Sequence, residues 1–461
     1  MSALSAFLAD IADVPVATDA PTLKLKSRDF HWFSPILKRE LDGKRAQAIV
    51  RPRDREELAR VVSAAAKRRV ALTMRGGGTG NYGQCVPLDG GIVLDMTGLD
   101  RVLSSRPGLV HVEAGALMLD IDKALAATGQ ELRFFPSTRA NATIGGFVCG
   151  GAGGVGSCSW GQIGDPGAVQ AATILTMEER PRTIRLAGPD VMKIVHAYGI
   201  NGIVLDVEVP TAPKHDWAEA VATFPDLAAA ARFGLALVED QVIAKKLVSI
   251  HQPGISRYLK RLAPLIAVEK AFAILMVSEP QTPTLATHVS AHGGEIVSPR
   301  GAAEAEAAAF ALAGGMPPLY EYTWNHTTLH AMKVDPSITY LQVLFPMGRT
   351  IETVLAAETA FAGEIEWHLE FQRRMAGHTC SSLCLVKYRS DERLMELIGL
   401  IEALGARVSN PHIHTIEGKG WKRIKADQEG FKTETDPYFL LNPGRLPTLE
   451  AAFHARVAAA E

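Results

Sequence analysis

Two histidine-containing segments in the second half of the chain carry side chains suited to proton transfer. Residues 321–330 read EYTWNHTTLH, and residues 410–417 read NPHIHTIE. Imidazole titrates near neutral pH, so histidine is the side chain best matched to accept a proton there. We therefore predict that these segments supply a proton acceptor or a substrate contact. The candidates are His326, His412 and His414.

The spacing of these histidines makes two arrangements testable. On a helix, His326 and His330 would share one face because they are four residues apart. On a strand, His412 and His414 would point to the same side and could bind one divalent metal, such as Zn or Mn, together with Glu417. Two polar histidines on an edge strand explain the second pattern equally well.

A glycine-rich segment near the start of the chain is suited to binding an anion. Residues 75–80 read RGGGTG and follow an apolar strand predicted over residues 70–74. Successive backbone N–H groups without side chains can converge on a pyrophosphate. An ordinary glycine-rich turn is the alternative. No Lys-Ser/Thr pair follows, as a P-loop would require, and no helix is predicted to open there, as a dinucleotide fingerprint would require.

The first part of the chain must position this glycine segment. Apolar spacing predicts a strand from residue 48 and an amphipathic helix that begins at Asp54 and Glu57, a capping pair. Alternating apolar residues predict another strand over 204–209. Pro210 and Pro213 follow, and we place a domain boundary there.

The second part alternates strands with longer helices and predicts an α+β arrangement. Strands are expected over 217–224, 246–251, 272–278, 338–345 and 382–388, and helices from Asp226, from Thr284, over 351–375 and from Asp391. The Ala-rich residues 301–313 are predicted to be helical or mobile. Arg373 and Arg374 then fall on a solvated helix surface. Gln252, Gln342, Lys387 and Arg389 are weaker candidates for contacts with substrate.

Three further segments follow the glycine-rich loop in a characteristic order. They are PSTRANATIGG at 136–146, WGQIGD at 160–165 and YGINGIV at 198–204. With the first loop they resemble the FAD-binding domain of the vanillyl-alcohol oxidase and p-cresol methylhydroxylase flavoproteins, over residues 46–212. The cofactor-binding residues that this resemblance implies are Arg75, Gly76, Gly77, Gly78, Thr79, Gly80, Pro136, Ser137, Thr143, Gly145, Gly146, Gly161, Asp165, Gly202 and Ile203.

The end of the chain adds a fifth element. Asp436-Pro437 followed by Asn442-Pro443-Gly444-Arg445 resembles the segment that returns to the flavin domain in the FAD-linked D-2-hydroxyacid dehydrogenases, including D-lactate dehydrogenases and glycolate oxidase large subunits. The resemblance makes Asn442 a cofactor contact and places Arg445 near the isoalloxazine as a catalytic candidate. Thr79 stands where covalently flavinylated relatives have histidine, so FAD is expected to bind non-covalently, with a tether from the cap left open.

The resemblance implies an α+β fold with a two-subdomain FAD-binding domain of the p-cresol methylhydroxylase type. We expect this domain to span 1–212 and 421–461, with an inserted α+β cap over 213–420 that contains an antiparallel sheet. The implied activity is oxidation of a hydroxy acid or related alcohol by hydride transfer to flavin N5. The alternatives are an aromatic alcohol or phenol oxidase that uses O2, suggested by Tyr320, Tyr322 and Trp324, and a non-catalytic FAD electron-transfer subunit.

The composition limits the kinds of partner and the cellular location that we expect. The 461 residues carry 48 Lys and Arg against 50 Asp and Glu, a net charge of −2 that argues against a nucleic-acid partner. Five cysteines without a CxxC pair, no basic leader and no long apolar run favour the cytoplasm. We leave open a peripheral membrane location, a homodimer and the electron acceptor, which could be a quinone, an electron-transfer protein or O2.

Overall fold

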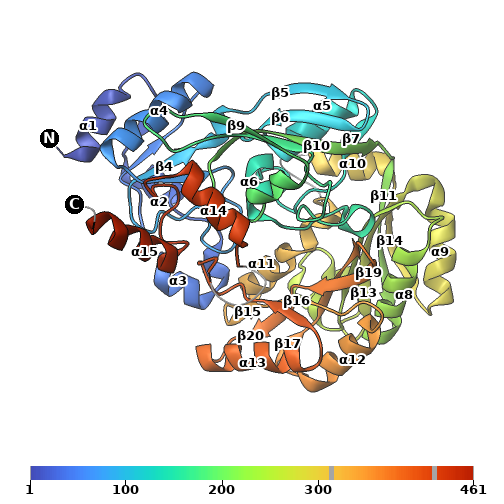
Figure 1. The fold of residues 1–461 in the computed structure, drawn as a ribbon. Helices are drawn as coiled ribbons and strands as arrows, with labels where there is room; N and C mark the ends of the chain where they lie inside the picture. The colour runs from blue at the N-terminus through green and yellow to red at the C-terminus, as the bar shows by residue number, and fades with distance from the viewer. Residues whose placement is uncertain (1, 311–315, 418–422, 460–461) are drawn as a thin grey trace.

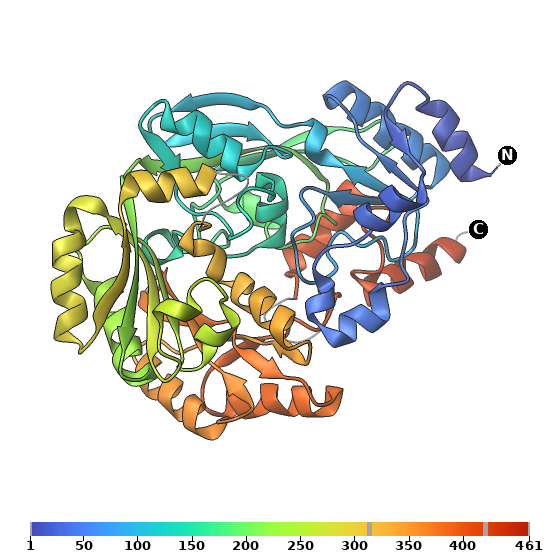
Figure 2. The same cartoon turned by 180° about the vertical axis from the view of Figure 1, so that it is seen from behind.

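The computed structural model describes residues 2–310, 316–417 and 423–459. Strands of the first 213 residues form two sheets, and strands from residue 217 to 409 form two more (Figure 1). Both ends of the described chain lie on the same side of the molecule, in the front view and from behind (Figure 2). Over the described residues, no helix combines the length and the apolar character needed to span a bilayer.

The first sheet has four strands in the order β1-β2-β4-β3. Strands β2, β4 and β3 are parallel, and helix α4 (Arg55–Arg68) connects β2 to β3. Asp54 caps α4 by accepting hydrogen bonds from the backbone of Glu56 and Glu57, as the sequence predicts. The bounds of its strands are β1 (Val16–Ala17), β2 (Ala48–Val50), β3 (Leu72–Arg75) and β4 (Ile92–Asp95). The nearby N-terminal helices are α1 (Ala3–Asp10), α2 (Ala20–Lys26) and α3 (Pro35–Leu41).

The second sheet is antiparallel and runs in the order β5-β6-β10-β8-β9. Its central strand, β10 (Ile203–Pro213), is long enough to pair with β7 as well. Helix α6 (Ile144–Gly150) packs beneath this sheet and lies at the centre of the molecule (Figure 2). The remaining elements of this region are β5 (Val102–Arg106), β6 (Leu109–Glu113), α5 (Met118–Ala126), β7 (Gln130–Leu132), α7 (Ser157–Trp160), β8 (Ala171–Leu175) and β9 (Thr183–Ala187).

The third sheet has eight strands in the order β14-β11-β13-β12-β18-β19-β16-β21. Helix α8 packs on its central strands, and α12 packs on α8. The bounds of the strands are β11 (Trp217–Phe224), β12 (Lys245–His251), β13 (Ala271–Ser278), β14 (Glu295–Arg300), β16 (Gln342–Leu344), β18 (His368–Arg374), β19 (Gly377–Ser382) and β21 (Arg407–Ser409). The helices are α8 (Leu227–Glu239), α9 (Thr282–Ala291), α10 (Ala302–Phe310), α11 (Asn325–Val334), α12 (Thr350–Ala360) and α13 (Asp391–Ala403).

A small fourth sheet joins β15 (Ile338–Tyr340), β20 (Leu385–Lys387) and β17 (Ile365–Glu366). The strand expected over 338–345 is therefore two strands in different sheets, and the one expected over 382–388 is shortened to β20. Residues 311–313 of the Ala-rich segment lie outside the described residues.

The long helix predicted over 351–375 is wrong. Helix α12 ends at Ala360, and Gly363 adopts a positive φ of 79° that turns the chain away. The residues that follow form β17 and β18, whose polar side chains at His368, Glu370 and Gln372 are buried. Their alternation with Leu369 and Phe371 has the period of a strand buried on both faces.

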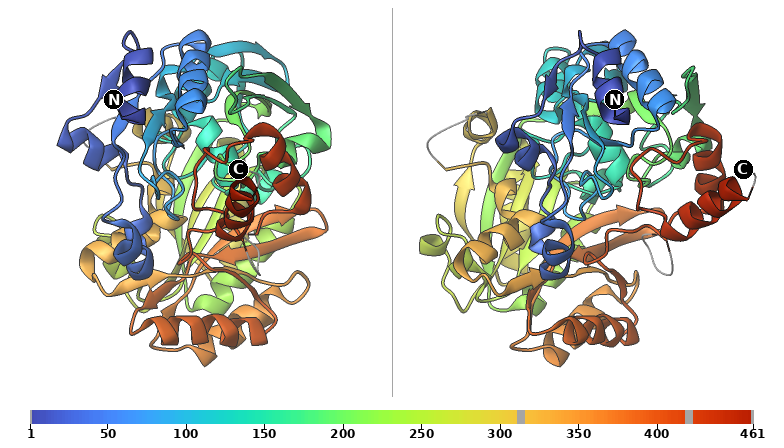
Figure 3. Two further views of the ribbon diagram at one scale, coloured as in Figure 1. Left: turned by 60° about the vertical axis from the view of Figure 1, so that its left-hand side comes forward. Right: turned by 90° about the vertical axis from the view of Figure 1, so that its left-hand side faces the viewer.

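The C-terminal residues return to the first sheet. Helices α14 (Ala426–Thr435) and α15 (Pro447–Ala458) lie against the first part of the chain (Figure 3). Between them, Leu441 pairs in parallel with Leu72, at the free edge of β3. The division into an FAD-binding domain (1–212 with 421–461) and a cap (213–420) remains our proposal, and the two sets of sheets support it.

Candidate flavin-binding and active site

A cavity of about 590 Å³ lies between the loops of the first sheets and strands β16, β18, β19 and β21. Its volume is in the range of pockets that bind small molecules and cofactors. Most of the predicted cofactor residues line it. These are Arg75, Gly76, Gly77, Gly78, Thr79, Gly80, Pro136, Ser137, Thr143, Gly145, Gly146, Gly202 and Ile203.

The glycine-rich loop packs directly against the segment before α6. A Cβ atom on Gly77 would lie 1.8 Å from the carbonyl oxygen of Asn141, and one on Gly76 would lie 2.0 Å from Thr143 Oγ1. Such distances are impossible, so only glycine permits this approach. The two predicted cofactor segments therefore form one continuous wall of bare backbone.

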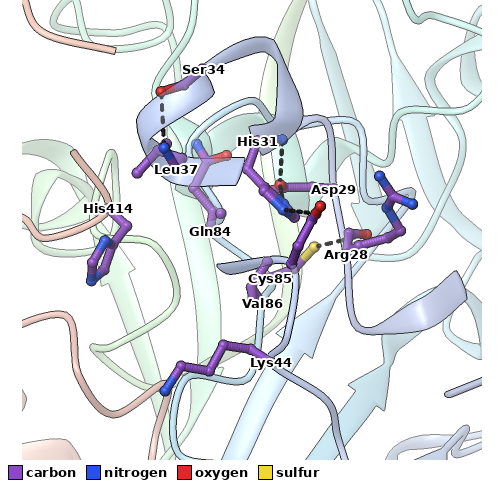
Figure 4. A network of polar contacts seen from close by, with 12 residues as sticks. Arg28, Asp29, His31, Ser34, Leu37, Lys44, Gln84, Cys85, Val86 and His414 are labelled. Carbon is purple, nitrogen blue, oxygen red and sulfur yellow. Dashed lines mark hydrogen bonds and ion pairs between the residues drawn. The ribbon is translucent and has the colours of Figure 1, made fainter. Parts of the chain in front are cut away.

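Several buried polar atoms on the cavity wall lack hydrogen-bond partners among the described residues. They are Asp29 Oδ2, Arg75 Nε, Gln84 Oε1 and the Tyr198 hydroxyl. Figure 4 shows why Asp29 has an oxygen to spare: its Oδ1 accepts a hydrogen bond from the His31 backbone at 2.9 Å and lies 3.1 Å from His31 Nδ1. Buried polar groups are normally paired. This set of donors and acceptors fits a polar ligand such as FAD, whose phosphate, ribityl and ring atoms can pair with them.

Three predicted cofactor residues do not line the cavity. Gly161 has a positive φ of 80° at a turn, where Asp165 accepts a hydrogen bond from the Gln162 backbone at 2.8 Å. Asn442 has a φ of 44° and donates to the carbonyl oxygens of Gln84 at 2.9 Å and Tyr198 at 2.7 Å. Asp165 and Asn442 thus hydrogen-bond to the backbone of residues that line the cavity, Gln162, Gln84 and Tyr198.

His326 is the one predicted catalytic residue that lines the cavity. It lies on α11, and its Nδ1 is 2.7 Å from Glu321 Oε2, so the carboxylate orients the ring. His330 lies on the same helix but stacks on Tyr322 with ring centroids 4.9 Å apart. Burial, reinforced by the charges of Lys333 and His326, lowers the pKa of His330 to about 4. His330 is therefore neutral near pH 7.

The structure does not bring His412, His414 and Glu417 together as a metal site. Among the described residues, no group of three His, Cys, Asp or Glu side chains is arranged to hold a metal. Residues 412–414 form no strand. Both His412 nitrogens are engaged, by Ser34 Oγ at 2.8 Å and by the Tyr340 carbonyl at 2.9 Å, and none of the three residues lines the cavity.

The other two members of this group have local structural partners. His414 Nδ1 lies 3.2 Å from Glu40, and burial, with Arg445 nearby, lowers its pKa. Glu417 accepts hydrogen bonds from the first backbone N–H groups of α15, at Thr448 and Leu449. That contact caps a helix, as carboxylates commonly do.

Arg445 does not reach the cavity. Its buried guanidinium donates to the carbonyl oxygens of Gly83 at 2.5 Å, Val86 at 2.8 Å and His414 at 3.1 Å. Burial lowers its pKa to about 10, which leaves it charged near pH 7. The predicted catalytic arginine thus fastens the C-terminal turn to the loop after the glycine segment.

Sequence reasoning missed Arg374, which lines the cavity from β18. Its Nη1 donates to Gln162 Oε1 at 2.7 Å, while its neighbour Arg373 is exposed. On a strand, Arg373 and Arg374 point to opposite faces, so only one of them can line the cavity. The helix predicted over 351–375 was wrong, and it placed both arginines on a solvated surface. Gln342 lines the cavity as suggested, whereas Gln252 accepts a hydrogen bond from the Trp367 backbone. Lys387 and Arg389 do not line it.

Comparison with known proteins identifies the first part of the chain. Residues 46–180 match the FAD binding domain family. The chain is 25% identical over 241 residues to glycolate oxidase subunit GlcD of Bacillus subtilis (strain 168), which covers 50% of this chain and 51% of that protein. It is 33% identical over 149 residues to D-2-hydroxyglutarate dehydrogenase of Escherichia coli (strain K12), covering 30% of this chain and 14% of that protein.

Other matches cover different lengths of the chain. D-lactate dehydrogenase of Archaeoglobus fulgidus is 35% identical over 119 residues, covering 25% of this chain and 26% of that protein. The chain therefore spans at most about half the length of these curated relatives. A solved structure of alkyldihydroxyacetonephosphate synthase shares the fold, with a TM-score of 0.69 over 95% of this chain and 84% of that chain at 15% identity. Residues 46–180 therefore carry an FAD binding domain, and parts of the chain are similar to glycolate oxidase, D-2-hydroxyglutarate dehydrogenase and D-lactate dehydrogenase.

Proposed function

We propose that this protein oxidises a hydroxy acid and transfers the hydride to FAD. The observation that carries the proposal is Arg374 and His326 in one cavity with the glycine-rich wall. A guanidinium binds a carboxylate through parallel hydrogen bonds, and an imidazole can accept a hydroxyl proton. The cavity thus offers a group for each polar end of a hydroxy acid.

The side chains divide the work as follows. Arg374 binds and orients the substrate carboxylate, and Gln162 fixes the guanidinium by accepting from its Nη1. Glu321 holds His326 by Nδ1, which leaves Nε2 to accept the hydroxyl proton. Residues of the glycine-rich wall, including Gly77 and Thr143, would hold FAD. When bound, FAD supplies the hydride acceptor.

Anaerobic flavin reduction tests this proposal. The purified protein, saturated with FAD, is mixed with a panel of 2-hydroxy acids and benzylic alcohols while absorbance at about 450 nm is followed. We expect hydroxy acids to bleach the flavin, and His326→Gln to slow bleaching by about 100-fold. Failure of every hydroxy acid to bleach the wild-type flavin would contradict the proposal.

The second candidate is an aromatic alcohol or phenol oxidase, because six Phe, Tyr and Trp side chains line the cavity. They are Phe30, Phe33, Tyr82, Phe147, Tyr198 and Trp324. Tyr320 and Tyr322, the other aromatic residues suggested from the sequence, do not line it. Preferential bleaching by benzylic alcohols, with hydrogen peroxide released in air at the turnover rate, would favour this candidate. Peroxide-free turnover with a quinone or an electron-transfer protein would favour a dehydrogenase.

A further inference from the structure

The residue before helix α11 has a backbone conformation that bulky side chains rarely adopt. Trp324 has φ 53° and ψ −137°. A non-glycine residue in such a region is held there by its surroundings, and such residues concentrate at binding sites. His326 lies two residues further on, in the first turn of α11, and lines the cavity. The conformation of residue 324 therefore sets how α11 presents the proposed proton acceptor to the cavity.

A buried carboxylate holds this backbone from the eight-stranded sheet. Glu370, on β18, is 1% exposed, and its Oε1 accepts a hydrogen bond from the Trp324 backbone N–H at 2.6 Å. The same oxygen accepts from Ser249 Oγ at 2.9 Å, which fixes the carboxylate in turn. Because a tryptophan side chain has no acceptor with which to cap a helix, this contact from a distant strand fixes the start of α11.

The same carboxylate reaches the residue after His326 through a second histidine. His368, also on β18, has its Nε2 2.6 Å from Glu370 Oε1 and 3.4 Å from Thr327 Oγ1. Thr327 is fully buried, and its Oγ1 donates to the Tyr322 carbonyl at 2.7 Å. Glu370 thus contacts, directly or through His368, positions 324 and 327, which lie on either side of His326.

The orientation of the His326 ring depends on the backbone at residue 324. Its Nδ1 lies 2.7 Å from Glu321 Oε2, and its backbone N–H donates to the Thr323 carbonyl at 3.1 Å. Both partners precede residue 324, so a change of backbone direction there would move the ring away from the carboxylate that orients it. A general base acts only within hydrogen-bond reach of the proton that it accepts, and a displacement of about 1 Å can slow a reaction about 100-fold.

We propose that Glu370 is the positioning residue for His326. It holds the backbone turn at Trp324, so that the ring stays paired with Glu321 through Nδ1 and Nε2 stays available to accept the proton. The inference rests on the proposed function, and it extends that function from the reacting side chains to a buried residue that does not line the cavity.

The protonation pattern of the His326 ring tests the inference without turnover. The FAD-saturated protein carries isotope-labelled histidine, and nitrogen NMR at about pH 8, where imidazole is ordinarily neutral, shows which ring nitrogen bears the proton. The His326 signals are those missing from His326→Gln. In the wild type we expect the proton on Nδ1, facing Glu321. In Glu370→Ala we expect a mixture of both tautomers, because that pairing is lost.

Flavin reduction adds a kinetic test. We expect Glu370→Ala to lower the limiting rate of anaerobic reduction by a hydroxy acid about 30-fold. The apparent Kd of the acid should change less than about threefold, because Arg374 keeps its contact with Gln162. Glu370→Gln keeps an acceptor for the Trp324 N–H and should stay within about threefold of the wild-type rate. Adding Glu370→Ala to His326→Gln should slow reduction by no more than about twofold further, because a base that is absent cannot be misplaced.

Two further variants separate positioning from loss of stability. Glu57→Ala, in α4, removes another buried carboxylate that accepts from a backbone N–H, that of Arg53 at 2.8 Å, and Glu57 does not line the cavity. We expect this control to lower stability and to keep the His326 signals and the reduction rate of the wild type. If Glu370→Ala does not fold, Glu370→Asp, which keeps the charge but is one methylene shorter, should show the same changes to a smaller extent.

The outcomes distinguish this inference from the proposed function. Unchanged His326 signals in Glu370→Ala, or in Glu370→Asp where it replaces it, overturn the inference. The same mixture of tautomers in Glu57→Ala also overturns it, as does a loss of rate that adds fully to that of His326→Gln. Mixed tautomers confined to the Glu370 variants support the inference even if no hydroxy acid bleaches the wild-type flavin, in which case the proposed function alone fails.

Discussion

Arg373 and Arg374 are adjacent on one strand but have different surroundings. Both lie on β18, where successive side chains point to opposite faces. Arg374 lines the cavity, whereas Arg373 is exposed and donates to the Ser159 carbonyl at 3.5 Å. Two adjacent and chemically identical residues therefore form a matched pair for testing substrate binding.

Substitution of these arginines should have unequal effects. We expect Arg374→Gln to raise the KM for a hydroxy acid at least about tenfold, because a charge-assisted bond to the carboxylate is lost. Arg373→Gln should leave KM within about twofold of wild type. Steady-state kinetics with one hydroxy acid measures both. Equal effects of the two substitutions would contradict the assignment of Arg374.

His330 should make the folded protein sensitive to mild acid. Its folded-state pKa, lowered to about 4 chiefly by burial, lies below the ordinary value of 6.5. Between these values the unfolded chain binds more protons than the folded one. The stability from neutral His330 is therefore complete above pH 6.5 and is lost progressively as the pH falls toward 4.

Replacing His330 should flatten this dependence. We expect His330→Gln to lose less stability than the wild type between pH 7 and pH 4.5, by up to about 2 kcal/mol after allowance for partial exposure. Urea unfolding at a series of pH values measures the difference. His454→Gln, at an exposed position on α15, serves as control and should follow the wild-type curve.

The role of a single residue could be predicted where it depends on the local sequence, and could not be predicted where its partners are distant in the chain. The glycines of residues 76–80 could be predicted because their lack of side chains is itself the signal. Arg445 could not, since its partners are carbonyl oxygens of residues far away in the chain. The same holds for His412, which bonds Ser34 and Tyr340. A polar side chain near a recognised motif can therefore form hydrogen bonds with backbone groups and take no part in catalysis.

At the scale of elements, two loops make one binding wall. Gly77 meets the carbonyl of Asn141, at the start of the turn into α6, and backbone on both sides leaves no side chain that could move aside. A substitution at position 77 therefore tests directly whether these two loops bind FAD.

We expect Gly77→Ala to weaken FAD binding at least about tenfold, because the new methyl group must displace one loop from the other. Titration of the apoprotein with FAD, followed by flavin fluorescence, measures the Kd. Gly399→Ala, on the exposed side of α13 where a Cβ meets nothing within 4 Å, should bind FAD as the wild type does. An unaltered Kd in Gly77→Ala would argue against this wall as the cofactor site.

Elements with a clear period could be predicted closely, and those that depend on distant pairing could not. Strand β11 has the predicted bounds, and α8 begins after its capping Asp226. Strand β18 was mistaken for helix because it is buried between β12 and β19, so its polar and apolar residues are both inside. The alternation of polar and apolar residues over 368–372 has the period of a strand, but it predicts one solvent-exposed face, whereas pairing with β12 and β19 buries both faces.

At the scale of the whole molecule, Arg445 connects segments that are distant in sequence. Its guanidinium joins the C-terminal turn to the loop at residues 83–86 and to the segment at residue 414. Lysine cannot reproduce this fork of donors. Arg445→Lys should therefore lower the stability of the fold and leave the catalytic rate nearly unchanged.

We expect Arg445→Lys to lower the free energy of unfolding by about 3 kcal/mol, since buried carbonyl oxygens lose their donors. Urea unfolding of the holoprotein measures the loss, and kcat at low temperature should stay within about twofold of wild type. Arg456→Lys, at an exposed site on α15, is the control and should unfold like the wild type. A large fall in kcat without loss of stability would return Arg445 to a catalytic role.

The pairing of Leu72 with Leu441 affects how the chain is made. During synthesis β3 emerges long before Leu441, which pairs at its outer edge. An unpaired strand edge invites pairing with other chains. Until residue 441 has been synthesised, the outer edge of β3 lacks this partner and is open to pairing with other chains.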